Sequence, residues 1–196
     1  MQSTLRSVAV YCASSSQVRD SFFQAAFRLG ECFARAGVEV VYGDGGIGLM
    51  GELARGVLSC GGKITGVIPQ FMVDEGWNNP QSTRTIVVET MHERKALIER
   101  MADGMVALPG GIGTFEEVLE CLTWKQLGLH TKPVVLLNQD GYFDTFLACL
   151  DKMVEEKMMR DIHRRMFAVV RSAEEVLPAL QTMPAWDSAI RREAAI

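Results

Sequence analysis

The chain has 196 residues, 48% of them hydrophobic, and a formal net charge of −4. This length and hydrophobic content fit one domain with a sizeable core and exclude an intrinsically disordered chain. The acidic balance gives no overall positive field to attract nucleic acid or an anionic membrane, and no apolar run approaches the roughly 20 residues of a membrane-spanning helix. The amino-terminal residues lack the pattern of a secretory signal. We therefore expect a cytoplasmic protein without nucleic-acid or membrane partners.

Short β-branched segments alternate with longer amphipathic segments along the chain. The strands are predicted at Ser7–Tyr11, Val38–Tyr42, Lys63–Ile68, Thr85–Val88, Met105–Leu108, Pro133–Leu137 and Phe167–Val170. The helices are predicted at Ser21–Ala36, Leu49–Cys60, Met91–Met101, Phe115–Leu127, Phe143–Lys157 and Ala173–Thr182. Only Pro69–Thr83 is expected to form a long loop.

This alternation predicts an α/β protein with a three-layer, Rossmann-like fold, in which a central parallel sheet of about seven strands carries helices on both faces. We expect one nucleotide-binding domain over residues 1–183 and a C-terminal tail over 184–196. In such sheets, ligands bind beyond the carboxyl ends of the strands. The loops that follow the strands are therefore the first places to search for a site.

The cysteines and histidines predict no metal site and no disulfide framework. The five cysteines are scattered and form no CxxC pair, and the three histidines lack the spacing of metal ligands. We expect buried thiols in a reducing compartment, histidines that are solvated or locally hydrogen-bonded, and no cofactor. The residues concerned are Cys12, Cys32, Cys60, Cys121, Cys149, His92, His130 and His163.

Two candidate anion sites follow the first two predicted strands. Ser14, Ser15 and Ser16 supply hydroxyl donors, although such serines equally fit an ordinary polar turn. Glycines of the segment Gly43–Gly51 can bring backbone N–H groups close to a ligand oxygen at the start of a helix. The segment contains GxGxxG, but it follows the second strand and no acid ends the next strand, so we exclude an NAD site. No Walker P-loop is present.

The segment Leu108–Glu117 is a stronger candidate. A buried-type strand ends there, three glycines expose backbone donors, and a helix is expected to begin with Thr114. Thr114 and Glu117 also match a T-x-x-E capping box, which requires no ligand. The capping box leaves the density of glycines unexplained. Both interpretations can hold together, with Thr114 capping the helix while the loop binds phosphate.

Arg94 is the most informative single residue. In a helix over Met91–Met101 it falls near the middle of the apolar side. A buried arginine must be paired or face a polar cavity, because an unpaired buried charge is very costly. Two explanations remain open at this point: a structural ion pair with Glu116, Glu117 or Glu120, and a contact with a ligand.

Several segments match, in the same order, the motifs of one enzyme family. Pro109–Glu117 reads PGGxGTxxE, and further matches are Gly45–Gly51, Met91–Lys95, Trp124–His130 with Lys132 and Pro133, and Leu137–Tyr142. Together they cover most of the chain and resemble the LOG ("Lonely guy") family of cytokinin riboside 5'-monophosphate phosphoribohydrolases. Asp44 departs from the usual glycine, and Phe71 and Met72 stand where plant members tend to carry an acid. These departures concern the preferred base more than the reaction.

The resemblance implies hydrolysis of the N-glycosidic bond of a nucleoside 5'-monophosphate, which releases free base and ribose 5-phosphate. It also implies Arg94 and Glu117 as the catalytic pair, and a homodimer with its sites near the shared interface. Contacts with the substrate and its phosphate are expected at Ser14, Gly45, Gly46, Gly48, Met91, Lys95, Gly110, Gly111, Ile112, Gly113, Thr114, Glu116 and Thr123. The apolar residues around the predicted helix Phe115–Leu127 also suggest burial on more than one side.

The expected mechanism requires an ionised Glu117. The first turn of a helix and the nearby Arg94 both favour the carboxylate, which suits a base or a stabiliser of the cation forming at the sugar. Arg94 keeps its proton, so it aligns Glu117 or holds the substrate. The group that protonates the departing base is not identified by the sequence.

Two other functions stay open. One is a general AMP or nucleoside-monophosphate nucleosidase, and the other is a non-catalytic carrier of a phosphorylated ligand, since molybdenum-cofactor carriers are similar in fold and glycine loops. An acid facing inward beside Arg94 favours an enzyme, because a carrier of an anionic cofactor gains little from it. The older label of lysine decarboxylase finds no support, because no lysine is marked for a Schiff base.

Overall fold

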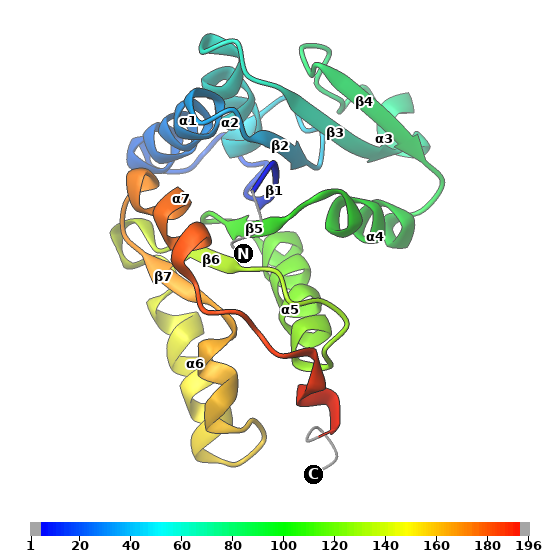
Figure 1. Cartoon of the computed structure of the whole chain (residues 1–196). Helices are drawn as coiled ribbons and strands as arrows, with labels where there is room; N and C mark the ends of the chain where they lie inside the picture. The colour runs from blue at the N-terminus through cyan, green and yellow to red at the C-terminus, as the bar shows by residue number, and fades with distance from the viewer. Residues whose placement is uncertain (1–4, 193–196) are drawn as a thin grey trace.

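A seven-stranded parallel sheet runs through the protein in the order β4-β3-β2-β1-β5-β6-β7 (Figure 1). The computed structural model describes residues 5–192. The strands are β1 Ser7–Tyr11, β2 Glu39–Tyr42, β3 Ile64–Pro69, β4 Arg84–Val88, β5 Gly104–Ala107, β6 Val134–Leu137 and β7 Ala168–Val170. The order reverses between β1 and β5, and this switch point is where ligands bind in such sheets.

Helices cover both faces of the sheet, as Figure 1 shows. They are α1 Asp20–Arg35, α2 Gly48–Ser59, α3 Gln70–Asp74, α4 Met91–Met101, α5 Ile112–Gln126, α6 Asp144–Glu155 and α7 Ala173–Thr182. Short 3₁₀ turns are formed by Gln139–Gly141, Asp161–Met166 and Ser188–Arg192. Residues from α1, α2 and α7 form one buried cluster with the sheet, and residues from α4, α5 and α6 form the other.

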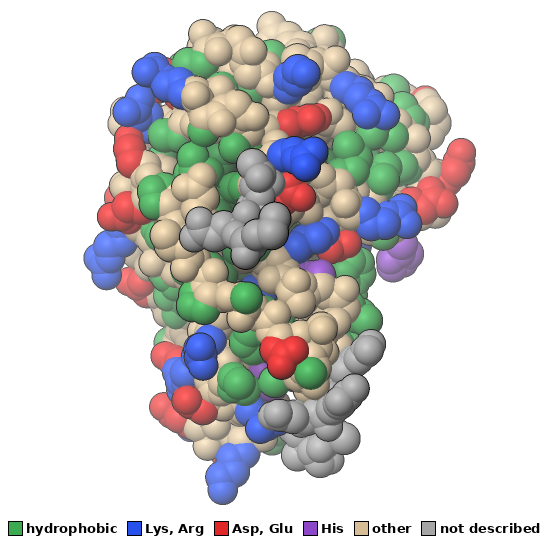
Figure 2. Space-filling model, in the orientation of Figure 1, with side chains coloured by type: hydrophobic (Ala, Val, Ile, Leu, Met, Phe, Trp, Pro, Cys, Tyr) green, Lys and Arg blue, Asp and Glu red, His purple; other side chains and the backbone are tan. Residues whose placement is uncertain are grey.

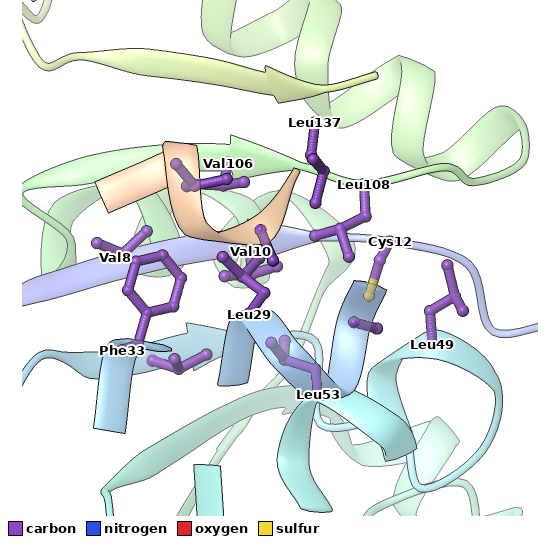
Figure 3. Packing of buried hydrophobic residues seen from close by; sticks show 14 of the residues in the cluster. Val8, Val10, Cys12, Leu29, Phe33, Leu49, Leu53, Val106, Leu108 and Leu137 are labelled. Atoms are coloured by element: carbon purple, nitrogen blue, oxygen red, sulfur yellow. The ribbon is translucent and has the colours of Figure 1, made fainter. Parts of the chain in front are cut away.

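Alternate residues of β1 pack into these two clusters. Val8 and Val10 face Leu29 and Phe33 of α1 (Figure 3), whereas Ala9 and Tyr11 belong to the cluster on the opposite face. Because both faces are covered, the strand is apolar from Val8 to Tyr11, which is the pattern of a parallel sheet. The predicted α/β class, with about seven parallel strands and helices on both faces, is confirmed.

The start of α5 differs from the prediction. The helix begins at Ile112 with Gly111 as its N-cap, and no side chain caps it. The predicted capping box of Thr114 and Glu117 is therefore wrong, because the extended backbone of Gly111 starts the helix before Thr114 is reached. A smaller difference is α3, a short helix inside the segment that was predicted as a loop.

The segment after α7 packs against α5. Trp186 Nε1 donates a hydrogen bond to the carbonyl oxygen of Lys125 at 2.9 Å, and Ile190 is buried. These residues lie in the predicted tail, so at least this part of it is in contact with the domain. The domain boundary after residue 183 stays a prediction.

Acidic and basic side chains are interspersed on the face drawn in Figure 2. Between residues 5 and 192, no helix has the length and apolar character needed to span a bilayer. Over the same stretch, no cluster of His, Cys, Asp or Glu side chains is arranged to hold a metal ion.

Candidate functional site

The loops after β1, β2 and β5 meet at one edge of the sheet, because the strands are parallel and adjacent. Backbone hydrogen bonds join them: Ala13 N donates to Pro109 O at 3.1 Å, and Leu49 N donates to Ala13 O at 2.9 Å. The three segments predicted as anion sites are therefore parts of one arrangement at the switch point of the sheet.

The loop between β5 and α5 leaves the start of its helix open. The first N–H groups of a helix have no acceptor within the helix, and no side chain caps α5. A Cβ atom added at Gly111 or Gly113 would meet nothing within 4 Å. Ile112 is 90% exposed. The space beside Gly111 and Gly113 is therefore open, at the positive end of a 15-residue helix.

The carbonyl side of the same loop is held by the protein. Tyr142 donates a hydrogen bond to Gly110 O at 2.5 Å, and its ring packs on Phe22 and Phe115. A Cβ atom at Gly110 would lie 2.1 Å from Thr114 Oγ1, so only glycine fits there. The loop is thus fixed on the side of the Gly110 carbonyl, while the space beside Gly111 and Gly113 stays open.

The loop between β2 and α2 is closed by contacts within the protein. Gly48 has a φ of +65°, and a Cβ atom there would lie 2.4 Å from the carbonyl carbon of Ser14. Leu49 N and Met50 N both donate to Ala13 O. Gly45 forms an isolated antiparallel bridge with Asn78. The protein itself therefore uses the amides of Leu49 and Met50 at the start of α2.

Arg94 is buried and reaches from α4 across the ends of β2 and β3. Its Nε donates to Val67 O at 3.0 Å, and its Nη2 donates to Gly43 O at 2.7 Å. A Cβ atom at Gly43 would lie 1.9 Å from Nη2, so the glycine makes room for the guanidinium. Nη1 lies 3.9 Å from Met91 Sδ, and among the described residues it has no oxygen partner.

The ion pair expected as an alternative for Arg94 is not present among the described residues. Lys95 forms the ion pairs with these glutamates instead. Its Nζ donates to Glu116 and, at 3.1 Å, to Glu120. Burial lowers the pKa of Arg94, while the negative charges of Glu117 and then Asp44 oppose that change. Arg94 is therefore a buried cation that is stabilised by carbonyl oxygens and two nearby acids.

Glu117 lines a cavity of about 10 Å³, a volume near the minimum for a single water molecule. The other lining residues are Tyr11, Lys95, Glu99, Glu120, Cys121 and Trp124. Burial raises the pKa of Glu117 to about 7, and the charge of Arg94 only partly offsets this. Burial therefore outweighs the charge of Arg94, which was expected to favour the ionised form of this carboxyl group. Because α5 begins earlier than predicted, Glu117 lies in its second turn, where the helix dipole acts more weakly.

The other residues that were predicted to contact the substrate lie at different distances from the open helix start. Ser14 lies within the loop that follows β1, and Met91 is the first residue of α4. Lys95 and Glu116 are paired with each other. Thr123 lies three turns along α5, about 16 Å from its start, and donates to Leu119 O. Their contacts with a substrate stay predictions.

Three residues near the site were not predicted as functional. Tyr142 holds the open loop, Tyr11 lines the cavity beside Glu117, and Asp44 is a fully buried acid next to Arg94. In the sequence, Asp44 was marked by its departure from the family's glycine, and Tyr142 ends the matched segment Leu137–Tyr142, which assigned it no role. Tyr11 reaches the site through the fold, and no local pattern marks it.

The fold and the site define an α/β protein with an open helix start at the switch point of its sheet, beside a buried arginine and a protonatable glutamate. Residues 50–180 match the family model described as "Possible lysine decarboxylase". The cytokinin riboside 5'-monophosphate phosphoribohydrolase LOG2 of Arabidopsis thaliana is 40% identical over 92% of this chain and 84% of its own. The corresponding enzyme LOG of Oryza sativa is 39% identical over 95% and 80%. The chain belongs to this family, the LOG family.

Solved structures share the fold at lower sequence identity. The molybdenum cofactor carrier protein of Chlamydomonas reinhardtii superimposes with a TM-score of 0.70 and 22% identity, over 92% of this chain and 98% of that one. The molybdenum cofactor binding protein of Rippkaea orientalis gives a TM-score of 0.69 and 19% identity, over 90% and 95%. This likeness concerns the fold alone.

Proposed function

We propose that the protein hydrolyses the N-glycosidic bond of a nucleoside 5'-monophosphate, and that it releases free base and ribose 5-phosphate. The observation that carries this proposal is the meeting of an open helix start with Arg94 and Glu117 at one edge of the sheet. The family relatives named as phosphoribohydrolases support the same reaction and favour a cytokinin base.

The phosphate binds at the start of α5. The N–H groups of Ile112, Gly113 and Thr114 donate to its oxygens, and the positive end of the helix favours its negative charge. The start of α2 offers fewer free donors, because Leu49 N and Met50 N already donate to Ala13 O, and it mainly shapes the neighbouring wall. The phosphate thereby fixes the distance at which the sugar stands from Glu117.

Glu117 acts on the glycosidic carbon. Breaking the bond builds positive charge on the sugar, which a nearby carboxylate stabilises while it accepts a proton from the attacking water. A pKa of about 7 suits this group to accept that proton and then to supply it to the departing base. Arg94, which keeps its charge, holds Glu117 and the substrate in place through its free Nη1 side.

The test is a base-release assay on AMP and isopentenyladenosine monophosphate. Glu117→Gln is expected to lower kcat by about 10²–10⁴-fold, because general acid–base catalysis contributes that much. Arg94→Ala is expected to lose base release as well. Glu52→Gln, in the second turn of α2, serves as a matched control and is expected to leave kcat unchanged. Nearly full activity in Glu117→Gln would contradict the assigned role.

A carrier of a phosphorylated ligand would bind nucleotide without releasing base. A panel of nucleoside monophosphates, assayed for free base, separates the carrier, a general nucleosidase and a cytokinin-specific enzyme. A thermal-shift series with AMP, adenosine and ribose 5-phosphate checks the phosphate site. Equal shifts with AMP and adenosine would contradict it, because adenosine has no phosphate.

The proposal includes a cytoplasmic homodimer. Leu119 and Leu127 at α5 and the following Leu129 are exposed, and such apolar side chains at one helix favour contact with a second copy. Light scattering after size exclusion is expected to give twice the mass of the chain. A monomer at micromolar concentration would contradict the dimer without affecting the proposed reaction.

A further inference from the structure

Asp44, the second residue after β2, is a buried acid whose carboxylate accepts hydrogen bonds from two hydroxyl groups. Its side chain is fully buried, and its φ of 59° lies in the left-handed region. Ser82 Oγ donates to its carboxylate at 2.6 Å, and Thr85 Oγ1 donates at 3.1 Å. A Cβ atom at Gly66 would lie 1.9 Å from Asp44 Oδ1, so the neighbouring strand leaves space for this carboxylate. Burial raises the pKa of Asp44, and the two hydroxyl donors oppose that change.

The same group of side chains fastens the loop over residues 76–83 to the edge of the sheet. Asn79 N donates to Asp44 O at 2.7 Å, and Asn79 Nδ2 donates to the hydroxyl of Tyr42 at 3.0 Å. That hydroxyl lies 2.9 Å from Ser82 Oγ, which closes the network. Without the carboxylate of Asp44, two hydroxyl groups of this partly buried network lose their acceptor, which is costly.

Asp44 also lies next to the contact that fixes Arg94. Arg94 Nη2 donates to the carbonyl oxygen of Gly43, the residue before Asp44. The charges of Asp44 and Arg94 attract each other. One residue therefore joins the loop over 76–83, the end of β2 and the buried guanidinium.

The order of the strands places this loop on the base side of the site. The phosphate donors follow β5, whereas the loop over 76–83 lies between α3 and β4 and is bridged to the loop after β2. A nucleotide whose phosphate binds after β5 and whose glycosidic bond lies near Glu117 and Arg94 extends its base toward β2 and β3. Trp77, at 56% exposure, and Ile47, at 66%, offer apolar surface on these two loops.

We infer that Asp44 is a positioning residue that holds the base-side wall of the site, and that it thereby sets the affinity for the base portion of the nucleotide. This inference rests on the proposed function. It predicts that loss of the carboxylate weakens binding of the whole nucleotide while binding of ribose 5-phosphate, which has no base, is retained.

Equilibrium binding of AMP and ribose 5-phosphate by calorimetry tests this inference. Asp44→Asn, in the Glu117→Gln background that prevents turnover, is expected to raise the Kd of AMP about tenfold or more, a change of about 1.4 kcal/mol, with the Kd of ribose 5-phosphate constant. Ser82→Ala, which removes one donor and keeps the acid, is expected to produce a smaller change of the same kind. Should Asp44→Asn fail to fold, Ser82→Ala tests the inference instead, through the change in the Kd of AMP relative to the change in the Kd of ribose 5-phosphate.

Asp140→Asn is the matched control. Asp140 also has a positive φ, of 53°, and accepts a hydrogen bond from a serine, Ser21, at 2.6 Å, but it follows β6. It is expected to leave both dissociation constants unchanged. Equal weakening of AMP and ribose 5-phosphate by Asp44→Asn, or no weakening of either, would overturn the inference. Absence of base release by the wild-type protein, with the AMP-selective loss still present, would instead contradict only the proposed reaction.

Discussion

The two glycine loops of the site are similar in sequence and opposite in structure. The loop after β2 uses its glycines for packing: Gly48 lies against the backbone of Ser14, and the amides that follow it bind Ala13 O. The loop after β5 keeps Gly111 and Gly113 free of contacts, and the start of its helix uncapped. Glycine content therefore does not identify an anion site; what identifies it is whether the protein already uses the amides.

The largest expected effect tests the packed loop. Gly48→Ala places a Cβ atom against Ser14 and Ser15 and imposes a left-handed backbone on alanine, so we expect a loss of about 3 kcal/mol in the free energy of unfolding. Gly37→Ala is the matched control, because Gly37 has a similar φ of +69° and free space around it. It is expected to cost only about 1 kcal/mol. Urea denaturation measures both, and equal losses would show that the loop is not tightly packed.

Glu117, beside the open loop after β5, is expected to lower the free energy of unfolding as the pH rises. The folded pKa of Glu117, about 7, lies above its ordinary value of 4.5, so the folded state binds the proton more tightly and stability decreases as pH rises between these values. Glu117→Gln removes this cost, and we expect it to be more stable than the wild type at pH 8 by up to about 3 kcal/mol. Near pH 4 the two proteins are expected to be alike. An unfolding difference independent of pH would contradict the raised pKa.

The open loop is tested by Gly113→Ala. Its Cβ atom meets no protein atom, and alanine favours a helix, so we expect unchanged stability or a gain of up to about 1 kcal/mol. The added methyl group enters the space assigned to phosphate, so KM for AMP is expected to rise about tenfold. Thermal unfolding and initial rates measure the two effects. A loss of stability as large as that of Gly48→Ala would remove the contrast between the loops.

The smallest expected effect concerns the support behind the open loop. Tyr142→Phe removes one hydrogen bond to Gly110 O and keeps the ring contacts, so we expect a loss of about 1 kcal/mol in stability. A rise of KM with constant kcat would show that the bond also positions the phosphate donors. Tyr142→Leu, which removes the ring as well, is expected to be less stable than Tyr142→Phe.

The sequence predicts the fold well because strands β1, β3, β5 and β6 are mostly buried on both faces and most helices carry an amphipathic pattern. The helix α4 begins at Met91 as predicted, where Thr90 and Glu93 form a capping box. The same kind of pattern at Thr114 and Glu117 predicted a capping box that is not formed, because the backbone of Gly111 starts α5 earlier. Local patterns locate helix starts only when no neighbouring residue offers a better start.

The chemistry of the site was less predictable than its location. Arg94 was identified because a charge on the apolar side of a helix must be paired or face a polar cavity. The structure places it, buried, at the edge of the site. The raised pKa of Glu117 depends on burial beside residues such as Tyr11, which is distant in sequence. Asp44 receives its hydrogen bonds from residues 38 and 41 positions away. Such environments arise only when the sheet is assembled.

The contact of Trp186 with α5 has a practical consequence. The indole donates to Lys125 O at the end of the helix that carries Glu117, and Lys125 Nζ lies 5.8 Å from the ring centre. A protease that cuts between α7 and Trp186 would release this clasp and let the last turn of α5 fray. Cleavage far from the nucleotide would then cause a gradual decline in turnover, and resistance to a non-specific protease would report how firmly this segment is docked.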